Sequence, residues 1–270
     1  MGKCLGLTFL NSCFVEVIQQ YETFLIGDEM LSRKAILIGA PSVEEYLPGV
    51  VQDIKDMKAF LCSPIGGAWR EDEIVTLVDQ SKATVTKHLN SCADVDYVFV
   101  LCAGHGEHQV LGANGSTVIY LTEEDTLSID SINSRGKRQF VIADVCRHER
   151  KIAISEALLK AAFESYSSED KFDYRAAFDS AVMSCSEGRI VAYSCSVNQS
   201  AGEDEKGGAF TQALMASPNA YLPKGSHSIV NVKQAFDWAH DQLTKKSSAQ
   251  TPVFNAGRRL DYYPFAVIAK

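Results

Sequence analysis

The stretch YVFVLCAGHG (Tyr97–Gly106) joins an apolar run to a polar end in which glycines flank a histidine. Its first six residues are rich in β-branched and aromatic side chains, which is typical of a buried strand. A second run of the same kind, QFVIADVCRHE at residues 139–149, leads into Cys146. The two runs therefore predict strands that end in chemically reactive side chains.

Strands and helices are predicted to alternate along the rest of the chain. Further apolar runs predict strands at residues 34–39, 73–78 and 189–195. Apolar residues at helical spacing predict helices at residues 49–62, 82–92, 207–215 and 230–243. The last apolar segments, at 250–255 and 261–269, are expected to close the sheet. This alternation predicts an α/β fold, with a mostly parallel sheet flanked by helices on both faces.

Composition and charge narrow the possible functions. The chain has 270 residues, of which 46% are hydrophobic and 22% charged, as in ordinary globular domains. Its net charge of −8 argues against a nucleic-acid binder, which needs a basic face. None of the eight cysteines forms a C-x-x-C pair, and several lie in apolar runs, so a reducing, cytoplasmic location is expected.

Regular patterning begins at Lys34, so residues 1–33 are assigned to an N-terminal extension and residues 34–270 to one domain. The extension is too polar to span a bilayer, and no clear small-residue cleavage site follows its short apolar run. No membrane association is therefore predicted.

His105 and Cys146 fall at the ends of two predicted strands, where parallel sheets carry their functional side chains. A thiol with an ordinary pKa near ~8.5 is mostly protonated at neutral pH, so it needs a base to become a good nucleophile. An imidazole can take that proton and later protonate a leaving amine. The glycines beside His105 let a substrate backbone approach, and they leave the Gly106 amide free to stabilise an oxyanion.

Other interpretations of these residues stay open. Taken alone, such a cysteine is usually part of the core and such a histidine part of a loop. Cys102, His105 and His108 form a C-x-x-H-x-x-H pattern that suggests zinc, although this spacing converges poorly at a strand end, and no metal site is assigned. A nucleotide- or flavin-binding protein is disfavoured, because neither glycine-rich phosphate motif follows the first strand.

The chain resembles the caspase-haemoglobinase family of cysteine peptidases, and within it the metacaspase- or orthocaspase-like branch of bacteria. The resemblance covers residues 34–268 and is carried by VLCAGHGEH, IADVCRHE and YSCSVNQSAGEDEKGGAFTQAL, with KAILIG and GVVQDIKDMKAFL in support. It implies the caspase-haemoglobinase fold and peptide hydrolysis through an acyl-enzyme. By the same resemblance, His105 is the catalytic histidine, Cys146 is the nucleophile, and the amides of Gly106 and Cys146 form the oxyanion hole.

The resemblance also bears on the substrate. Asp144 stands where animal caspases, which cleave after Asp, have glutamine, and Asp53 matches the second acidic pocket residue of the metacaspase-like branch. Two carboxylates in one pocket repel acidic side chains and attract Arg or Lys. We therefore expect protein or peptide substrates that are cleaved after Arg or Lys at P1, the residue before the scissile bond. The alternative for Asp53 is a solvated position on a helix face.

Regulation is less well defined by the sequence. Residues 151–183 fall where related enzymes often carry an activation or processing loop, and self-cleavage is expected at Lys160, Lys171 or Arg175, unless the segment forms two ordinary crossover helices. The acidic run Glu123–Asp125 resembles the calcium site of some metacaspases, or is a solvated loop. No other cofactor is expected. The alternative function is a catalytically silent caspase homologue that acts as a binding or scaffold module.

Overall fold

The computed structural model describes residues 31–111, 114–132, 135–147, 172–246 and 249–270. The chain divides into two compact units, Met1–Leu31 and Ser32–Lys270, and the description below concerns the second. Most of the predicted N-terminal extension and of the 151–183 segment, with Lys160 and Lys171, lies outside the described residues.

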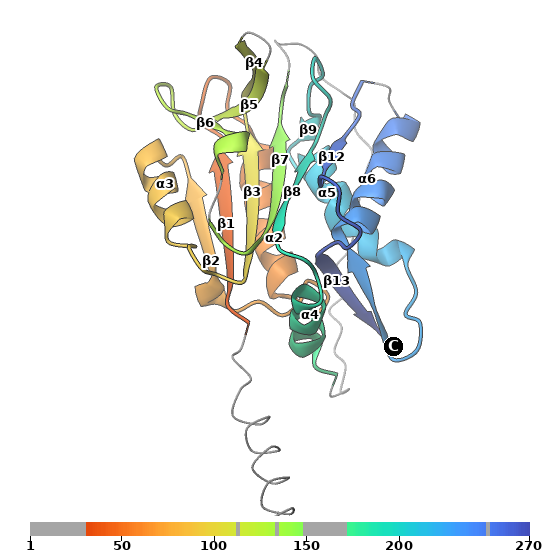
Figure 1. Ribbon diagram of the computed structural model, residues 1–270. Coiled ribbons are helices and arrows are strands. Elements are labelled where there is room, and N and C mark those ends of the chain that lie inside the picture. Colours follow the sequence, from red (N-terminus) through yellow and green to blue (C-terminus); the bar gives the residue numbers. More distant parts are fainter. Residues whose placement is uncertain (1–30, 112–113, 133–134, 148–171, 247–248) are drawn as a thin grey trace, which may run out of the picture. The chain divides into compact units, whose positions relative to one another are not determined.

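A six-stranded sheet in the order β12–β8–β7–β3–β1–β2 forms the centre of the domain (Figure 1). Its strands are β1 (Arg33–Ala40), β2 (Ile74–Val78), β3 (Tyr97–Gly104), β7 (Arg138–Val145), β8 (Gly188–Tyr193) and β12 (Val253–Asn255). The first five run parallel, and β12 is antiparallel to β8. Every residue of β3 and β7 is buried, as is typical of central parallel strands. The predicted α/β fold with a mostly parallel sheet is confirmed.

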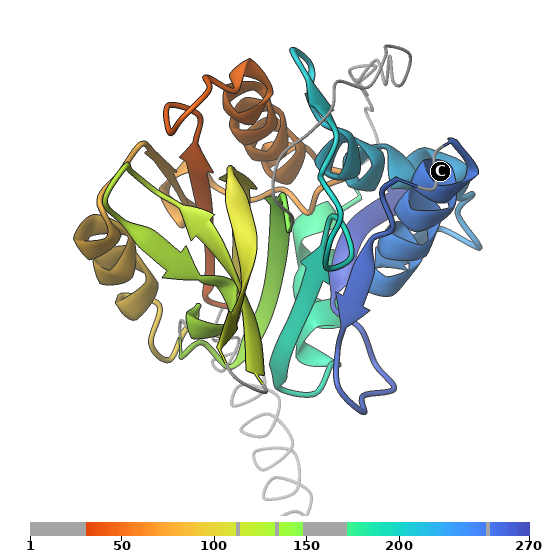
Figure 2. The ribbon, with the colours of Figure 1, turned by 90° about the horizontal axis from the view of Figure 1, so that it is seen from above.

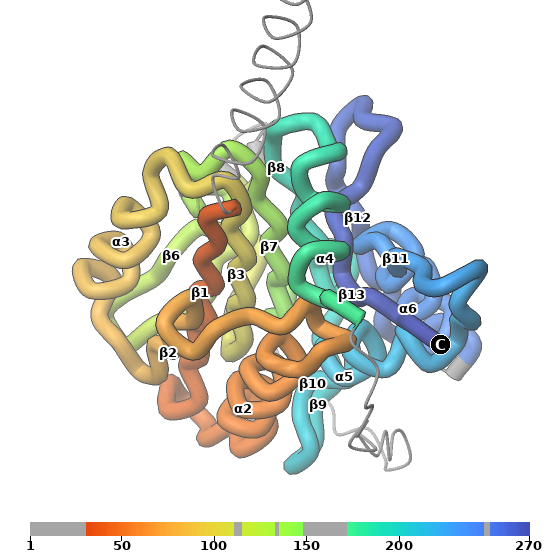
Figure 3. Tube along the Cα trace, turned by 90° about the horizontal axis from the view of Figure 1, so that it is seen from below, coloured from red at the N-terminus to blue at the C-terminus, as the bar shows by residue number. Residues whose placement is uncertain are grey.

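Helices cover both faces of this sheet, as the sequence predicts. They are α2 (Pro48–Cys62), α3 (Lys82–Asn90), α4 (Tyr174–Met183), α5 (Ala209–Ala216) and α6 (Val232–Lys246). Ile36 of β1 shares a core cluster with Val85 of α3, whereas the opposite side of β1 approaches α2, where a Cβ on Gly39 would lie 3.0 Å from Ile54. Figures 2 and 3 show α2 and α4 on the same face of the sheet. Within the described ranges, no helix has both the length and the hydrophobicity needed to cross a membrane.

A small antiparallel sheet begins directly after His105 and was not expected from the sequence. It consists of β4 (Gly106–Leu111), β5 (Asn114–Tyr120) and β6 (Thr126–Ser128). Ile119 and Leu127 bring it into the core cluster that also contains α3. The hairpin therefore covers the α3 side of the central sheet and is fixed at the point where β3 ends.

The C-terminal strand pairs differently from our expectation. The 250–255 segment does extend the central sheet, as β12, but β13 (Pro264–Ala269) pairs with β11 (His227–Asn231) in a separate two-stranded sheet. Phe265 stacks on Phe60 of α2 at 5.0 Å between ring centroids, so β13 packs beside α2. The remaining short elements are β9 (Glu203–Asp204), β10 (Gly207–Gly208), η1 (Glu71–Glu73), η2 (Ile129–Ser131) and η3 (Ser217–Ala220).

Arg175 is the one predicted self-cleavage point among the described residues. It lies in the first turn of α4, where its Nη1 donates to Glu73 at 3.0 Å and its Nε lies 3.7 Å from Asp179. The same two carboxylates pair with the buried Arg33. Access of a peptidase to Arg175 therefore requires the opening of α4 and of this ion-pair network.

Candidate active site

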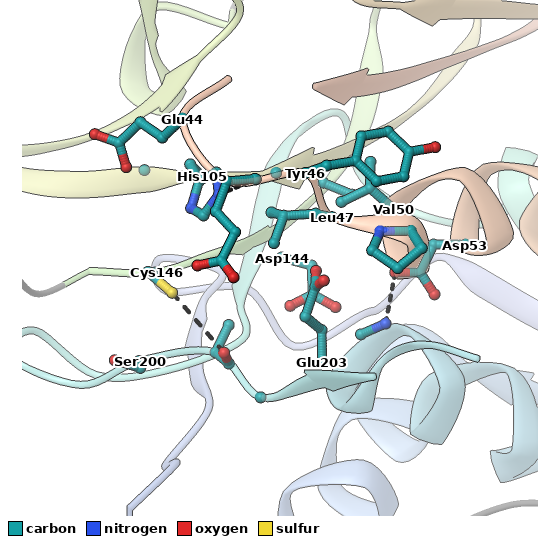
Figure 4. Close-up of a pocket in the computed structure, with 18 of the residues that line it drawn as sticks. Glu44, Tyr46, Leu47, Val50, Asp53, His105, Asp144, Cys146, Ser200 and Glu203 are labelled. Atoms are coloured by element: carbon teal, nitrogen blue, oxygen red, sulfur yellow. Dashed lines mark hydrogen bonds between the residues drawn. The ribbon is translucent and has the colours of Figure 1, made fainter. Parts of the chain in front are cut away.

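A cavity of about 830 Å³ opens at the carboxyl ends of β3 and β7. Its walls come from the loop after β1, the start of α2, the turn from β3 into β4, the end of β7 and the segment 200–208. The predicted residues His105, Gly106, Cys146, Asp53 and Asp144 all line it (Figure 4). Residues far apart in the sequence are thus brought together at the edge of the sheet where parallel folds carry their chemistry.

The pairing of β3 with β7 sets the positions of His105 and Cys146. Gly104 at the end of β3 is the register partner of Val145 at the end of β7. His105 directly follows Gly104, and Cys146 directly follows Val145. Figure 4 shows both side chains on the same side of the cavity, with Asp144 and Asp53 further along it. Both side chains therefore line the same cavity.

The imidazole is oriented by a backbone carbonyl. Nε2 of His105 lies 2.9 Å from the carbonyl oxygen of Glu45, in the loop between β1 and α2. A carbonyl only accepts, so Nε2 carries the proton and the lone pair of the neutral ring is on Nδ1. This contact could not be predicted from the sequence, because any residue at position 45 supplies a backbone carbonyl.

The thiol of Cys146 lies in surroundings that disfavour its ionised form. Its Sγ donates to the carbonyl of Ala201 at 3.8 Å. Burial raises the pKa of Cys146, and the nearby carboxylates of Asp144 and Glu203 raise it further. A base is therefore required before this sulfur can act as a nucleophile.

The ladder between β4 and β5 leaves the Gly106 amide available. Tyr120 donates its amide to the His105 carbonyl, so these two residues form a hydrogen-bonded pair. Gly106 opposite Ile119 is the next pair, and because antiparallel pairs alternate, its N–H points away from β5. A side chain at position 106 would meet the Val118 carbonyl at 2.3 Å. The backbone at this position thus needs glycine.

Asp53 and Asp144 are buried carboxylates, with 1% and 6% of their surface exposed. Asp53 accepts the Gly208 amide at 2.7 Å, and Asp144 accepts both the amide and the hydroxyl of Thr211, at 3.0 and 2.7 Å. Burial raises the pKa of each, and for Asp53 the charge of Asp144 raises it further. The alternative of a solvated helix face is therefore wrong for Asp53.

The pair Gly207–Gly208 explains why glycines precede the helix that begins at Ala209. A Cβ on Gly207 would lie 2.3 Å from Oδ1 of Asp53, and one on Gly208 would lie 2.4 Å from Oδ2 of Asp144. Gly207 also has a φ of +126°, which side chains rarely tolerate. Only glycines let this backbone reach both carboxylates.

Glu203 is a third acidic residue of this cavity that the sequence analysis missed. Burial, together with the charges of Asp144 and Asp204, raises its pKa to about 7. Among the described residues that line the cavity there is no lysine or arginine, whereas the acidic ones number eight: Glu44, Glu45, Asp53, Glu107, Asp144, Glu203, Asp204 and Glu205. The acidic run Glu203–Glu205 was the one feature of the sequence that could have indicated this third carboxylate.

The residues of the two metal-binding interpretations, zinc at Cys102, His105 and His108 and calcium at Glu123–Asp125, include several with other contacts. Glu123 accepts the amide of Glu44 and Asp125 accepts the amide of Lys82, so both carboxylates serve to hold backbone. Cys102 is fully buried in the core. In the part of the chain that the structure describes, no three His, Cys, Asp or Glu side chains are grouped to hold a metal ion.

A family model described as the caspase domain matches residues 32–263, which is most of the chain. The chain therefore belongs to the caspase-domain family of cysteine peptidases. No curated protein matches it.

Two solved structures share the fold. Protein GSU0716 from Geobacter sulfurreducens is 19% identical with a TM-score of 0.56, and the match covers 88% of this chain and 99% of that one. Caspase-1 from Spodoptera frugiperda is 13% identical with a TM-score of 0.57, covering 87% of this chain and 92% of that one. The predicted caspase-haemoglobinase fold is confirmed.

The contact between the glycine pair and the carboxylates can be tested through stability. Gly208→Ala forces a methyl group against Asp144 and should lower the free energy of unfolding by about 1–3 kcal/mol. Urea denaturation measures this. Gly202→Ala is the matched control, because its Cβ would meet the end of the Gln250 side chain at 3.2 Å and the Ala209 Cβ at an ordinary 3.9 Å. Equal losses in both variants would contradict the proposed packing.

The burial of Glu203 predicts a pH-dependent stability. Its pKa is about 7 in the folded protein against 4.5 ordinarily, so its contribution to stability is lost as the pH rises from about 4.5 through about 7. Glu203→Gln should therefore raise the melting temperature at pH 8, by at least about 2–4 °C, and by less at pH 5. The exposed neighbour Glu205, changed to Gln, serves as the control. A gain of equal size at both pH values would exclude a raised pKa.

Proposed function

We propose that the protein is a cysteine endopeptidase that cleaves protein or peptide substrates after Arg or Lys, with Cys146 as nucleophile and His105 as its catalytic partner. One observation carries the proposal: a histidine and a cysteine that follow register-paired residues share a single cavity with two buried carboxylates. Membership of a peptidase family implies protein substrates.

The chemistry begins with the transfer of the thiol proton. A rotation about the Cα–Cβ bond of Cys146 releases Sγ from Ala201 and turns it toward Nδ1 of His105, the ring nitrogen that Glu45 leaves free to accept. The sulfur then attacks the carbonyl carbon of the scissile bond. The amides of Gly106 and Cys146 stabilise the resulting oxyanion.

The second half of the reaction returns the protein to its starting state. The tetrahedral intermediate expels the amine, which takes the proton from the imidazolium, and a thioester to Cys146 remains. His105 next removes a proton from water, whose oxygen attacks the thioester. The sulfur leaves and recovers the proton from His105.

The charge of the cavity supports a basic side chain at P1. Asp53, Asp144 and Glu203 together form an acidic pocket beside Cys146, and five further acidic residues line the same cavity. A guanidinium or ammonium group would gain charge-assisted hydrogen bonds there. An aspartate at P1 would add an unpaired negative charge to a partly buried site, at a cost of several kcal/mol.

A binding or scaffold module remains the alternative function. The observation in its favour is that Sγ of Cys146 is hydrogen-bonded to the backbone carbonyl of Ala201 in the free protein. The same acidic cavity would then hold basic peptides without cleaving them.

A peptide panel separates these functions. We expect fluorogenic peptides with Arg or Lys at P1 to be cleaved, those with Asp at P1 not to be, and Cys146→Ala to abolish cleavage. A panel with and without calcium also tests the calcium expectation. If Cys146→Ala binds a P1-Arg peptide and the parent protein binds but does not cleave it, the scaffold function holds instead. Cleavage after Asp would refute the acidic pocket.

The carboxylates of Asp53 and Asp144 should make the pocket select the P1 side chain by its charge rather than by its shape. Asp144→Asn and Asp53→Asn each keep the size of the side chain but remove its charge. We expect kcat/KM for a P1-Arg peptide to fall at least about tenfold, because hydrogen bonds to charged groups contribute about 1.5–3 kcal/mol. A matched peptide with neutral citrulline at P1 should lose far less.

The ratio of the two rates is the decisive measurement, because a general loss of fold lowers both. Asp237→Asn on α6, whose side chain is 55% exposed, is the control and should leave the ratio unchanged. If the ratio of kcat/KM for the P1-Arg peptide to that for the citrulline peptide is unchanged in both pocket variants, Asp53 and Asp144 do not recognise P1.

A further inference from the structure

The residue after the candidate nucleophile, Arg147, is a buried cation with only 8% of its surface exposed. Its Nε donates to the hydroxyl of Thr117 at 2.8 Å and its Nη1 to the carbonyl of Cys195 at 3.0 Å. The guanidinium lies over the ring of Tyr193, 4.4 Å from its centroid. These contacts are with neutral groups, and the nearby charge of Asp130, which accepts the Tyr193 hydroxyl, also favours the guanidinium cation. Burial of a cation is costly, and these interactions offset part of that cost while they tie the guanidinium to three separate segments.

The backbone of Arg147 makes a second set of contacts. Its amide donates to the carbonyl of Gln199 at 3.0 Å, and its carbonyl accepts the amide of Asn198 at 3.2 Å. The segment that follows, residues 200–205, lines the cavity and includes Ala201, the hydrogen-bond partner of the Cys146 thiol. Arg147 therefore fixes Cys146 relative to this wall of the cavity.

The contact with Thr117 connects Arg147 to the histidine side of the site. Thr117 lies on β5 and is the register partner of His108 on β4, the strand that starts at Gly106. Thr117 is 1% exposed, so the hydrogen bond is shielded from water. One guanidinium thus joins the end of β7, the end of β8 and the β4–β5 hairpin.

We propose that Arg147 is a positioning residue that holds Cys146 in register with His105 and the Gly106 amide. The inference rests on the proposed peptidase function and adds to it a residue that does not touch the substrate. Recognition of P1 should be independent of Arg147, because Asp53 and Asp144 are held by Gly208 and Thr211 instead.

An arginine is needed at this position for geometric reasons. Its planar group donates in two fixed directions while it stacks on a ring, whereas a lysine is a point charge that cannot reproduce this arrangement. Arg147→Lys therefore keeps the positive charge and removes the geometry. Arg138→Lys is the matched control, because Arg138 is also 8% exposed and donates to the Cys185 carbonyl, but lies at the opposite end of β7.

The first measurement is the separation of kcat from KM on a P1-Arg peptide, with urea unfolding in parallel. Displacement of reacting groups by about 1 Å costs roughly 100-fold in rate, so kcat of Arg147→Lys should fall about 10- to 100-fold while KM changes less than about twofold. Arg138→Lys should lose comparable stability and keep its kcat. An unchanged kcat in Arg147→Lys, or an equal fall in both variants, would overturn the proposal.

The second measurement needs no peptidase activity, so failure of the proposed function can be told apart from failure of this inference. The alkylation of Cys146 by iodoacetamide is followed against pH by peptide mass spectrometry, with the partly exposed Cys62 of the same molecule as internal reference. Arg147→Lys should shift the pH profile of Cys146 alone. Identical Cys146 profiles in parent and variant would refute positioning, even if no substrate is ever cleaved.

Thr117→Val supplies a second route if Arg147→Lys does not fold. It keeps the arginine and removes one acceptor, so a smaller change of kcat and of the Cys146 profile in the same direction is expected. A folded Thr117→Val protein with the parent's kcat and profile would also count against the proposal.

Discussion

The parallel register between β3 and β7 is the constraint on which the site depends. It pairs Ala103 with Asp144 and Gly104 with Val145. Since side chains alternate along a strand, Asp144 and Cys146 face the cavity while Val145 between them joins the core cluster. A shift by one residue would bury the thiol and expose the valine. The hydrophobic core thus specifies, through Val145, which residues meet in the cavity.

The same register creates an electrostatic problem, because it brings a buried Asp144 close to Asp53 and Glu203. Like charges in a low-dielectric site favour protonation, which is why burial and mutual repulsion raise the pKa of these groups. The amide of Gly208 and the amide and hydroxyl of Thr211 offset part of the cost. The charge that remains uncompensated is what a cationic ligand can neutralise. The cavity therefore lacks a positively charged group of its own among the described residues that line it.

The sequence predicts those parts of the structure that depend on local pattern. The buried strands β3 and β7 are evident from their composition, and so are the candidate catalytic residues at their ends. Asp53 needed the resemblance to a family, because its helix alone also fits a solvated carboxylate. The pairing partner of β13 and the β4–β6 sheet were missed, since an apolar run does not specify what it pairs with. The backbone carbonyl of Glu45 that orients His105 could not be predicted at all, because every residue type carries the same carbonyl.

In the free protein the carboxylates of the cavity disfavour ionisation of the proposed nucleophile, Cys146. This effect favours substrates with a basic P1 side chain. Burial raises the pKa of the Cys146 thiol and the charges of Asp144 and Glu203 raise it further, which disfavours the thiolate in the free protein. A guanidinium bound beside those carboxylates offsets their charge and removes part of that penalty on the thiolate. An acidic side chain would bring no such compensation. Under the proposed specificity, binding energy from P1 would be expressed in the chemical step as well as in affinity, which is the condition under which recognition increases kcat.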